Sequence, residues 1–264
     1  LAAQKLHPSV PEIVSAVLRL TRSPNASIHD LVRVIEQDDG LKQRMISVAN
    51  SGVYGVKRRV ATVTEAIVLM GWNAVKMVTL GSTILKRMSE KDNRLFTHSM
   101  RTANIATFIA QEAGLYKVEE ISVVGLLHDL GIMILEMYFN DAHLKTKQFA
   151  VDQEVPIHIA EYQLLGVDHA EIGSWVIEFW ELPDNIIESV ASHHEFDPKS
   201  YHARKTAVIH IADVLALAVD YRGPSWEKVS RLEPSALDIL GFSERDLKDL
   251  VLAVMRMKFD PIIV

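Results

Sequence analysis

The sequence of 264 residues is 48% hydrophobic, which is enough for one large domain or two small ones with a sizeable buried core. Its net charge of −6, without a long run of Lys or Arg, disfavours a nucleic-acid-binding protein, because such proteins gain affinity by neutralising phosphates. The absence of cysteine excludes a disulfide framework, a thiolate zinc site and a cysteine nucleophile, and it is compatible with a reducing cytoplasm. No apolar run is expected to reach the roughly 18 to 20 residues of a membrane span, so we predict no membrane segment.

Capping signals and the helical spacing of apolar residues predict helices nearly throughout the chain. In chain order, the capping-box pairs are Ser27 with Asp30, Thr62 with Glu65, and Ser243 with Asp246. Gly71 is placed to end the helix that begins near Thr62. No convincing run alternates between apolar and polar residues, and residues 6–11 and 50–59 are typical of loops. The pattern therefore predicts an all-α fold.

A polar run at residues 88–93 interrupts the apolar pattern and predicts a soft boundary near residues 88–95. Residues 1–90 contain about five short predicted helices. Residues 91–264 contain longer ones, which carry most of the histidines. Because the two parts could share one core, we interpret them as two helical lobes of a single domain.

Ionisable side chains recur on the apolar faces of five predicted helical segments in the second lobe. Their spacing from apolar neighbours is close to multiples of 3.6 residues, so these side chains are expected to point towards the packed side. A buried imidazole or carboxylate needs a partner, and one divalent cation such as Fe, Mn, Ni, Co or Zn can satisfy several of them. The candidate metal ligands are His98, His128, Asp129, His169, His193, His194 and Asp213.

The adjacent pair His128 and Asp129 indicates a site with one or two ions. Neighbours on a helix point about 100° apart, so adjacent ligands suit a site where each reaches a different metal or where the carboxylate bridges two. A single histidine on a helix face is more often an ordinary core residue, but its recurrence on consecutive helices favours a convergent cluster. We predict that the remaining histidines are surface or ordinary structural residues, namely His7, His29, His143, His158, His202 and His210.

The order of the candidate ligands resembles the HD superfamily of metal-dependent phosphohydrolases, and most of all its HD-GYP branch, which hydrolyses cyclic di-GMP. That family's H, HD, H, HH and D ligands correspond one by one to the seven candidates. Residues 128–131 (HDLG) resemble the HD-x-G signature, and residues 193–195 (HHE) resemble its HHE motif. Two features depart from the branch: Ile132 stands where a phosphate-contacting lysine is expected, and residues 196–201 (FDPKSY) replace the GYP loop. Metal binding can survive both changes, whereas both count against hydrolysis of cyclic di-GMP.

The first lobe resembles the amino-terminal lobe of HDOD domains. The resemblance lies in LHPSVPEIVSAVLRL from residue 6, IHDLVRVIEQDDGLKQRMISVANSGVYG from residue 28 and TVTEAIVLMGWNAVKMVTL from residue 62. With the second lobe it covers essentially the whole chain. It implies a bacterial signalling output module, in a family where many members have lost catalytic residues.

Two functions are therefore open. The first is a signalling module that contacts response regulators or second-messenger enzymes. In it the metal is a structural pin, meaning that it stabilises the fold and takes no part in catalysis. The second is a metal-dependent phosphohydrolase acting on an unidentified phosphoester or cyclic nucleotide. Residues that could bind a phosphate discriminate these two functions. After Asp129 no Lys or Arg occurs until Lys145. Arg101, one turn after His98, is a weak candidate for substrate binding, and its position also fits a solvated helix face. We favour the signalling module and expect neither a nucleic-acid nor a membrane partner. The basic residues 57–59 fit either a solvated loop or a contact with an acidic partner.

Overall fold

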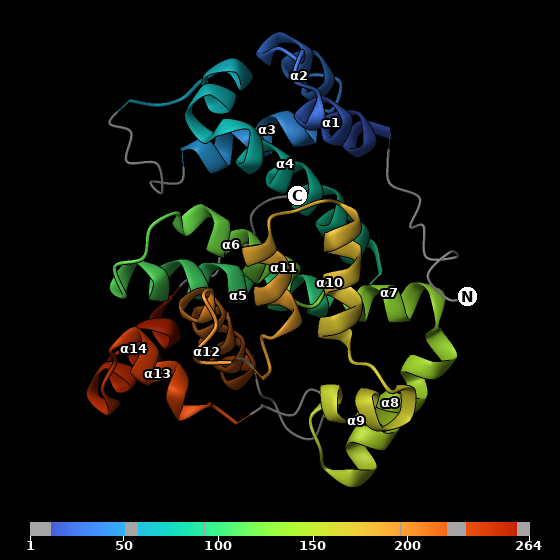
Figure 1. Cartoon of the computed structure of the whole chain (residues 1–264), viewed down its shortest axis with the longest axis vertical. Helices are drawn as coiled ribbons and strands as arrows, with labels where there is room; N and C mark the ends of the chain where they lie inside the picture. Colours follow the sequence, from blue (N-terminus) through green and yellow to red (C-terminus); the bar gives the residue numbers. More distant parts are fainter. Residues whose placement is uncertain (1–11, 51–57, 92, 196, 221–230, 258–264) are drawn as a thin grey trace. The chain divides into compact units, whose positions relative to one another are not determined.

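The structure is a computed structural model that describes residues 12–50, 58–91, 93–195, 197–220 and 231–257. These residues form fourteen helices and no strand, so the prediction of an all-α fold is confirmed (Figure 1). The predictions for His7 and for residues 51–57 lie outside the described residues. The helices are α1 (Glu12–Arg22), α2 (Ile28–Ile35), α3 (Asp39–Ala49), α4 (Val63–Lys91), α5 (Asn93–Glu112), α6 (Val118–Leu127), α7 (Leu130–Tyr138), α8 (Asn140–Gln153), α9 (Ile157–Leu165), α10 (His169–Phe179), α11 (Asp184–Ala191), α12 (Ala203–Asp220), α13 (Pro234–Leu240) and α14 (Glu244–Arg256).

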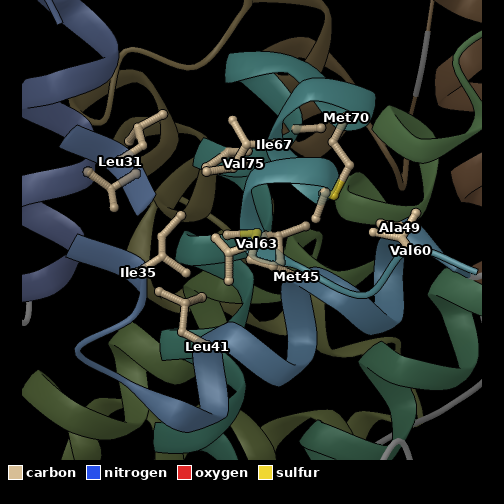
Figure 2. Close-up of a cluster of buried hydrophobic side chains, with 14 residues drawn as sticks. Leu31, Ile35, Leu41, Met45, Ala49, Val60, Val63, Ile67, Met70 and Val75 are labelled. Carbon is tan, nitrogen blue, oxygen red and sulfur yellow. The ribbon is translucent and has the colours of Figure 1, made fainter. Parts of the chain in front are cut away.

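The chain divides into two compact units, which meet in sequence between Arg87 and Met88. The first unit contains α1 to α3 and most of α4. Its core is a cluster of buried side chains from α1, α2, α3 and the first part of α4, together with Val60 (Figure 2). Leu31 and Ile35 are one turn apart on α2, and Leu41 and Met45 repeat that spacing on α3, so each helix turns one apolar face to the cluster.

Local signals in the first unit form much as the sequence predicts. Ser27 caps α2 and Asp30 completes the box, since each side chain accepts a hydrogen bond from the other residue's backbone N–H. At Gly71 the backbone adopts φ 75° and ψ 170°, and it leaves helical geometry there although α4 continues beyond the kink. A positive φ of this kind favours glycine, which accounts for the residue at the bend. In the predicted basic patch, Arg58 pairs with Glu65 at 3.1 Å, as expected of an exposed loop residue.

The second unit contains the remaining helices, which pack around α5, α6, α7, α10 and α12. α5 contacts both α6 and α12, while α10 contacts α7 and α11 (Figure 1). Apolar side chains such as Ile105, Ile109, Ile121 and Ile134 are fully buried in this unit. Their burial is the dominant favourable contribution to the stability of such a bundle.

One segment of the described residues, Glu120–Tyr138, has the length and the mean hydropathy (1.5) of a membrane span. Because Glu120, Asp129 and Glu136 interrupt its apolar residues, it is not an unbroken apolar run, and it does not contradict the prediction that no such run reaches the length of a span. The segment is 72% buried inside the protein, which is the behaviour of core helices. His128 and Asp129 lie between its two helices, α6 and α7, so this apolar segment carries two of the candidate ligands.

Candidate metal centre

The second unit brings all seven candidate ligands into one cluster. His98 comes from α5, His128 and Asp129 from the junction of α6 and α7, and His169 from the first residue of α10. His193 and His194 follow α11, and Asp213 lies in α12. Every member except His194 is buried, and the side chain of His194 is only 8% exposed. Five separate chain segments therefore converge on one buried, highly polar volume.

The carboxylate of Asp129 lies at the middle of the cluster, and its two oxygens face different histidines. Oδ2 lies 3.4 Å from Nε2 of His98 and 3.2 Å from Nε2 of His128. Oδ1 lies 3.2 Å from Nε2 of His169 and 3.8 Å from Nε2 of His193. Three sets of ligand atoms each lie within 4.8 Å of one another. The first group is His98, His128 and Asp213, and the second group is His169, His193 and His194. The third set, His128, Asp129 and His193, overlaps both groups and contains the central carboxylate.

In the first group, the carboxylate of Asp213 faces two imidazoles. Its Oδ1 lies 3.0 Å from Nε2 of His98 and 3.6 Å from Nε2 of His128, and those two ring nitrogens are 3.2 Å apart. The far side of the His128 ring is fixed, because its Nδ1 donates to the carbonyl of Gly125 at 2.8 Å. This hydrogen bond fixes Nδ1 as a donor and turns Nε2 towards the carboxylates, so that Nε2 would offer its lone pair to a metal ion that displaced its proton.

In the second group, the rings of His169 and His194 meet edge to face, with their Nε2 atoms 2.8 Å apart. Nδ1 of His193 donates to the carbonyl of Val190 at 2.7 Å, so this ring is held in the same way as His128. Nε2 of His193 has no hydrogen-bond partner among the described residues. Buried polar atoms are nearly always satisfied, so an orphaned ring nitrogen beside a carboxylate fits a metal ligand.

Two further residues, both on α9, belong to this site and were missed by the sequence analysis. The ring of His158 is stacked on His194, with centroids 4.0 Å apart and planes at 14°. Glu161 is fully buried, and its Oε2 accepts hydrogen bonds from Nδ1 of His169 at 2.6 Å and from the backbone N–H of His169 at 2.9 Å. The prediction that His158 is a surface or ordinary structural residue therefore needs correction. Its spacing of three residues from Glu161 puts both on one helix face, and that was the available signal.

The other histidines in the described residues lie away from the ligand atoms. His29 is exposed, His202 is half-buried and His143 is buried beside Glu136. His210 is buried and structural, because its Nδ1 donates to the carbonyl of His193 and its Nε2 accepts from the backbone of Glu233. The weak substrate candidate Arg101 has a half-buried side chain on α5, and none of the distances that define the cluster involves it.

The close approach of α7 and α10 depends on a glycine. An ideal Cβ atom built on Gly131 would lie 1.9 Å from the carbonyl oxygen of His169 and 2.9 Å from its Cα. No real Cβ tolerates these distances, so only glycine allows the first turns of the two helices to touch. This contact brings Asp129, two residues before Gly131, against the ring of His169.

The ionisation of the cluster follows from burial and from its carboxylates. Burial alone would lower the pKa of His128, but Asp129 and Asp213 outweigh it and raise that pKa to about 10. Burial, reinforced by the charges of His128 and His169, lowers the pKa of His193 to about 3. Burial would raise the pKa of Asp129, yet His128 and His169 hold it well below its usual range. Burial would lower the pKa of His169 too, but Glu161 and Asp129 outweigh it and hold that pKa well above its usual range. The protein by itself therefore balances ionised carboxylates with imidazolium groups at His128 and His169.

The donor set fits divalent transition metals. Imidazole nitrogens and carboxylate oxygens are ligands that suit Fe, Mn, Ni, Co and Zn. A cation in either group would take the place of the imidazolium protons as the counter-charge to Asp129 and Asp213. A cation in the second group would also satisfy the orphaned Nε2 of His193. The His/Asp cluster therefore has the composition and geometry of a metal site.

Comparison with known proteins places these observations in a family. A model of the HDOD domain matches residues 7–196, a range that includes every candidate ligand except Asp213. A solved HDOD domain protein of unknown function from Geobacter sulfurreducens is 22% identical, with a TM-score of 0.64 over 94% of this chain and 92% of that one. A candidate phosphohydrolase from Shewanella amazonensis is 20% identical, with a TM-score of 0.68 over 96% and 91%.

Two other relatives are longer than this chain. A candidate signal transduction protein from Marinobacter aquaeolei is 21% identical, with a TM-score of 0.65 over 94% of this chain and 57% of that one. An uncharacterised protein from Treponema pallidum is 24% identical over 200 residues, which are 74% of this chain and 39% of that protein. The match therefore spans well under half of that relative. At these identities the solved structures show that the helical fold is shared.

Proposed function

This chain belongs to the HDOD domain family, and from that premise we propose that it is a bacterial signal-transduction output module whose His/Asp cluster holds two divalent metal ions. The observation that carries the proposal is that the two carboxylate oxygens of Asp129 face different histidines. One oxygen faces His98 and His128, and the other faces His169 and His193. A carboxylate placed in this way suits a bridge between two cations.

Each ion would have its own ligands in addition to Asp129. The first group would hold one ion through His98, His128 and Asp213, and the second group would hold the other through His169, His193 and His194. When bound, such ions act as Lewis acids and neutralise charge on phosphoryl oxygens. The residues of the chain orient the metal ligands. The carbonyls of Gly125 and Val190 fix the rings of His128 and His193, so these imidazoles need no reorganisation when a metal ion binds.

The signalling role rests on the family and on the surroundings of the cluster. Ile132, at the position of the expected lysine, is buried in α7 and offers no cation to a phosphate. The proposed partners are response regulators or second-messenger enzymes of the cytoplasm. In this role the metal ions pin together five helices and the segment after α11, and they stabilise one arrangement of the second unit.

The metal content of the protein tests the proposal. We expect protein purified without a His tag to contain close to two transition-metal ions per chain by elemental analysis, and to lose them to a chelator. A chain that stays free of metal after incubation with Fe²⁺, Mn²⁺ and Zn²⁺ in turn would contradict it.

A metal-dependent phosphohydrolase is the second candidate function, because paired ion sites around a carboxylate also suit phosphoester hydrolysis. We nevertheless expect little or no hydrolysis of cyclic di-GMP, since Ile132 replaces the lysine and residues 196–201 replace the GYP loop. Chromatographic detection of the linear product, with Mn²⁺ or Fe²⁺ present, measures this. Turnover of about 1 per second, ordinary for an enzyme, would show that the prediction is wrong.

A further inference from the structure

Glu161 is a buried carboxylate that the ligand set does not include. Its side chain is fully buried in α9, and its Oε2 accepts both hydrogen bonds from His169. Its Oε1 has no hydrogen-bond partner in the part of the chain that the structure describes. A buried carboxyl group is costly unless it is hydrogen-bonded, so His169, which donates both of the hydrogen bonds that Oε2 accepts, is the partner that makes this burial tolerable.

The setting of His169 differs from that of the other oriented histidines. His128 and His193 donate from Nδ1 to neutral carbonyls within their own helical segments. His169 donates to a carboxylate on a different helix, and its Nε2 faces Asp129 and His194. A carboxylate partner fixes the ring and makes the opposite nitrogen a stronger electron donor to a metal.

The packing of α9 gives this hydrogen bond a second consequence. α9 packs mainly against α8 and only lightly against α10, and its own apolar cluster consists of Ala150, Ile157 and Ala160. It is linked to the metal centre by the two hydrogen bonds that Nδ1 and the backbone N–H of His169 donate to Glu161, and by the stacking of His158 on His194. A change at the second group can therefore reach α9 through these two side chains.

We propose that Glu161 is a positioning residue of the metal centre, which holds His169 for the second group and couples metal binding to the stability of α9. This inference rests on the proposed metal centre. Coupling between two parts of a protein is reciprocal, so metal bound at the second group stabilises α9, and displacement of α9 weakens metal binding. The α8–α9 pair thereby becomes the part of the second unit that senses metal occupancy.

Isothermal titration of the full chain with Mn²⁺ tests the positioning role. We expect Glu161→Gln, which keeps the shape of the side chain and removes its charge, to bind Mn²⁺ about 10- to 100-fold more weakly than the wild type. Glu171→Gln is the matched control, because Glu171 is an exposed carboxylate in the first turn of α10 and should leave the affinity unchanged. Equal Mn²⁺ affinity of Glu161→Gln and wild type would overturn the positioning role.

Hydrogen exchange of the amides in α9 tests the coupling. We expect residues 157–165 of the wild type to exchange more slowly with saturating Mn²⁺ than with chelator, and Glu161→Gln to lose this difference when it is also saturated. If amide exchange in α9 of the wild type is the same with Mn²⁺ and with chelator, the coupling is overturned. This comparison needs only the wild type, so it tests the coupling even if Glu161→Gln does not fold. A wild type that binds no metal would overturn the metal centre itself, whereas a wild type that binds Mn²⁺ as tightly as Glu161→Gln overturns this inference alone.

Discussion

Asp129→Ala is expected to abolish metal binding and, with it, the stability that the metal contributes. The substitution removes the carboxylate whose oxygens face both histidine groups. The second group then keeps only the more distant ligand carboxylate of Asp213, whose Oδ2 lies 4.0 Å from Nδ1 of His194. A ligand that binds only the folded state stabilises it by mass action, by about 2.7 kcal/mol at 100 times the dissociation constant. Thermal unfolding of wild type and variant, each with and without chelator, measures this contribution.

The pattern expected is a chelator-dependent fall of the unfolding midpoint in the wild type and no further fall in Asp129→Ala. Asp249→Ala serves as the control, since Asp249 is an exposed carboxylate on α14 and should keep the chelator response. If chelator leaves the wild-type midpoint unchanged although metal analysis finds bound ions, the metal is not a structural pin. The signalling proposal would then lose its account of what the metal does.

Gly131→Ala is expected to damage both the fold of the second unit and the metal centre. The new Cβ would lie 1.9 Å from the carbonyl oxygen of His169, and that neighbour is backbone, which cannot rotate away. α7 and α10 must therefore separate, at a cost of about 3 kcal/mol or more in the free energy of unfolding. Denaturant unfolding measures the loss, and Mn²⁺ titration of any folded fraction shows whether Asp129 still lies against His169.

Gly40→Ala is the comparison for that variant. Gly40 is exposed within α3, and a Cβ there meets only the Asp38 carboxylate at 3.2 Å. The gain in helix propensity, about 1 kcal/mol, should offset that contact. A Gly131→Ala protein that unfolds and binds Mn²⁺ like the wild type would show that α7 and α10 do not need this approach.

If both variants behave as expected, the glycine of the HDLG sequence has a mechanical role that is separate from metal ligation. His128 and Asp129 supply ligand atoms, whereas Gly131 allows the two helix ends to meet and so fixes the distance between Asp129 and His169. The short motif therefore combines two ligands with the packing contact that places one of them.

The helices and their starting points were accessible to sequence reasoning because the signals are local. Ser27 with Asp30 and Ser243 with Asp246 form complete capping boxes, in which residues three apart satisfy each other's backbone groups. Helical periodicity in the same way put His98 and His169 on apolar faces, which made them candidates before any contact was known. Their role as metal ligands stays a prediction, but their convergence in one buried cluster is a property of the structure.

Only the tertiary structure decided how the cluster is arranged. The sequence does not reveal that the oxygens of Asp129 divide between two groups, that Glu161 lies behind His169, or that Gly131 touches α10. These relations join residues on different helices, and their distances are set by how the helices pack. The sequence around a histidine is the same whether its ring hydrogen-bonds to a backbone carbonyl or, as His169 does, to a buried carboxylate on another helix. The roles of His158 and Glu161 therefore follow from the position of α9 beside the site.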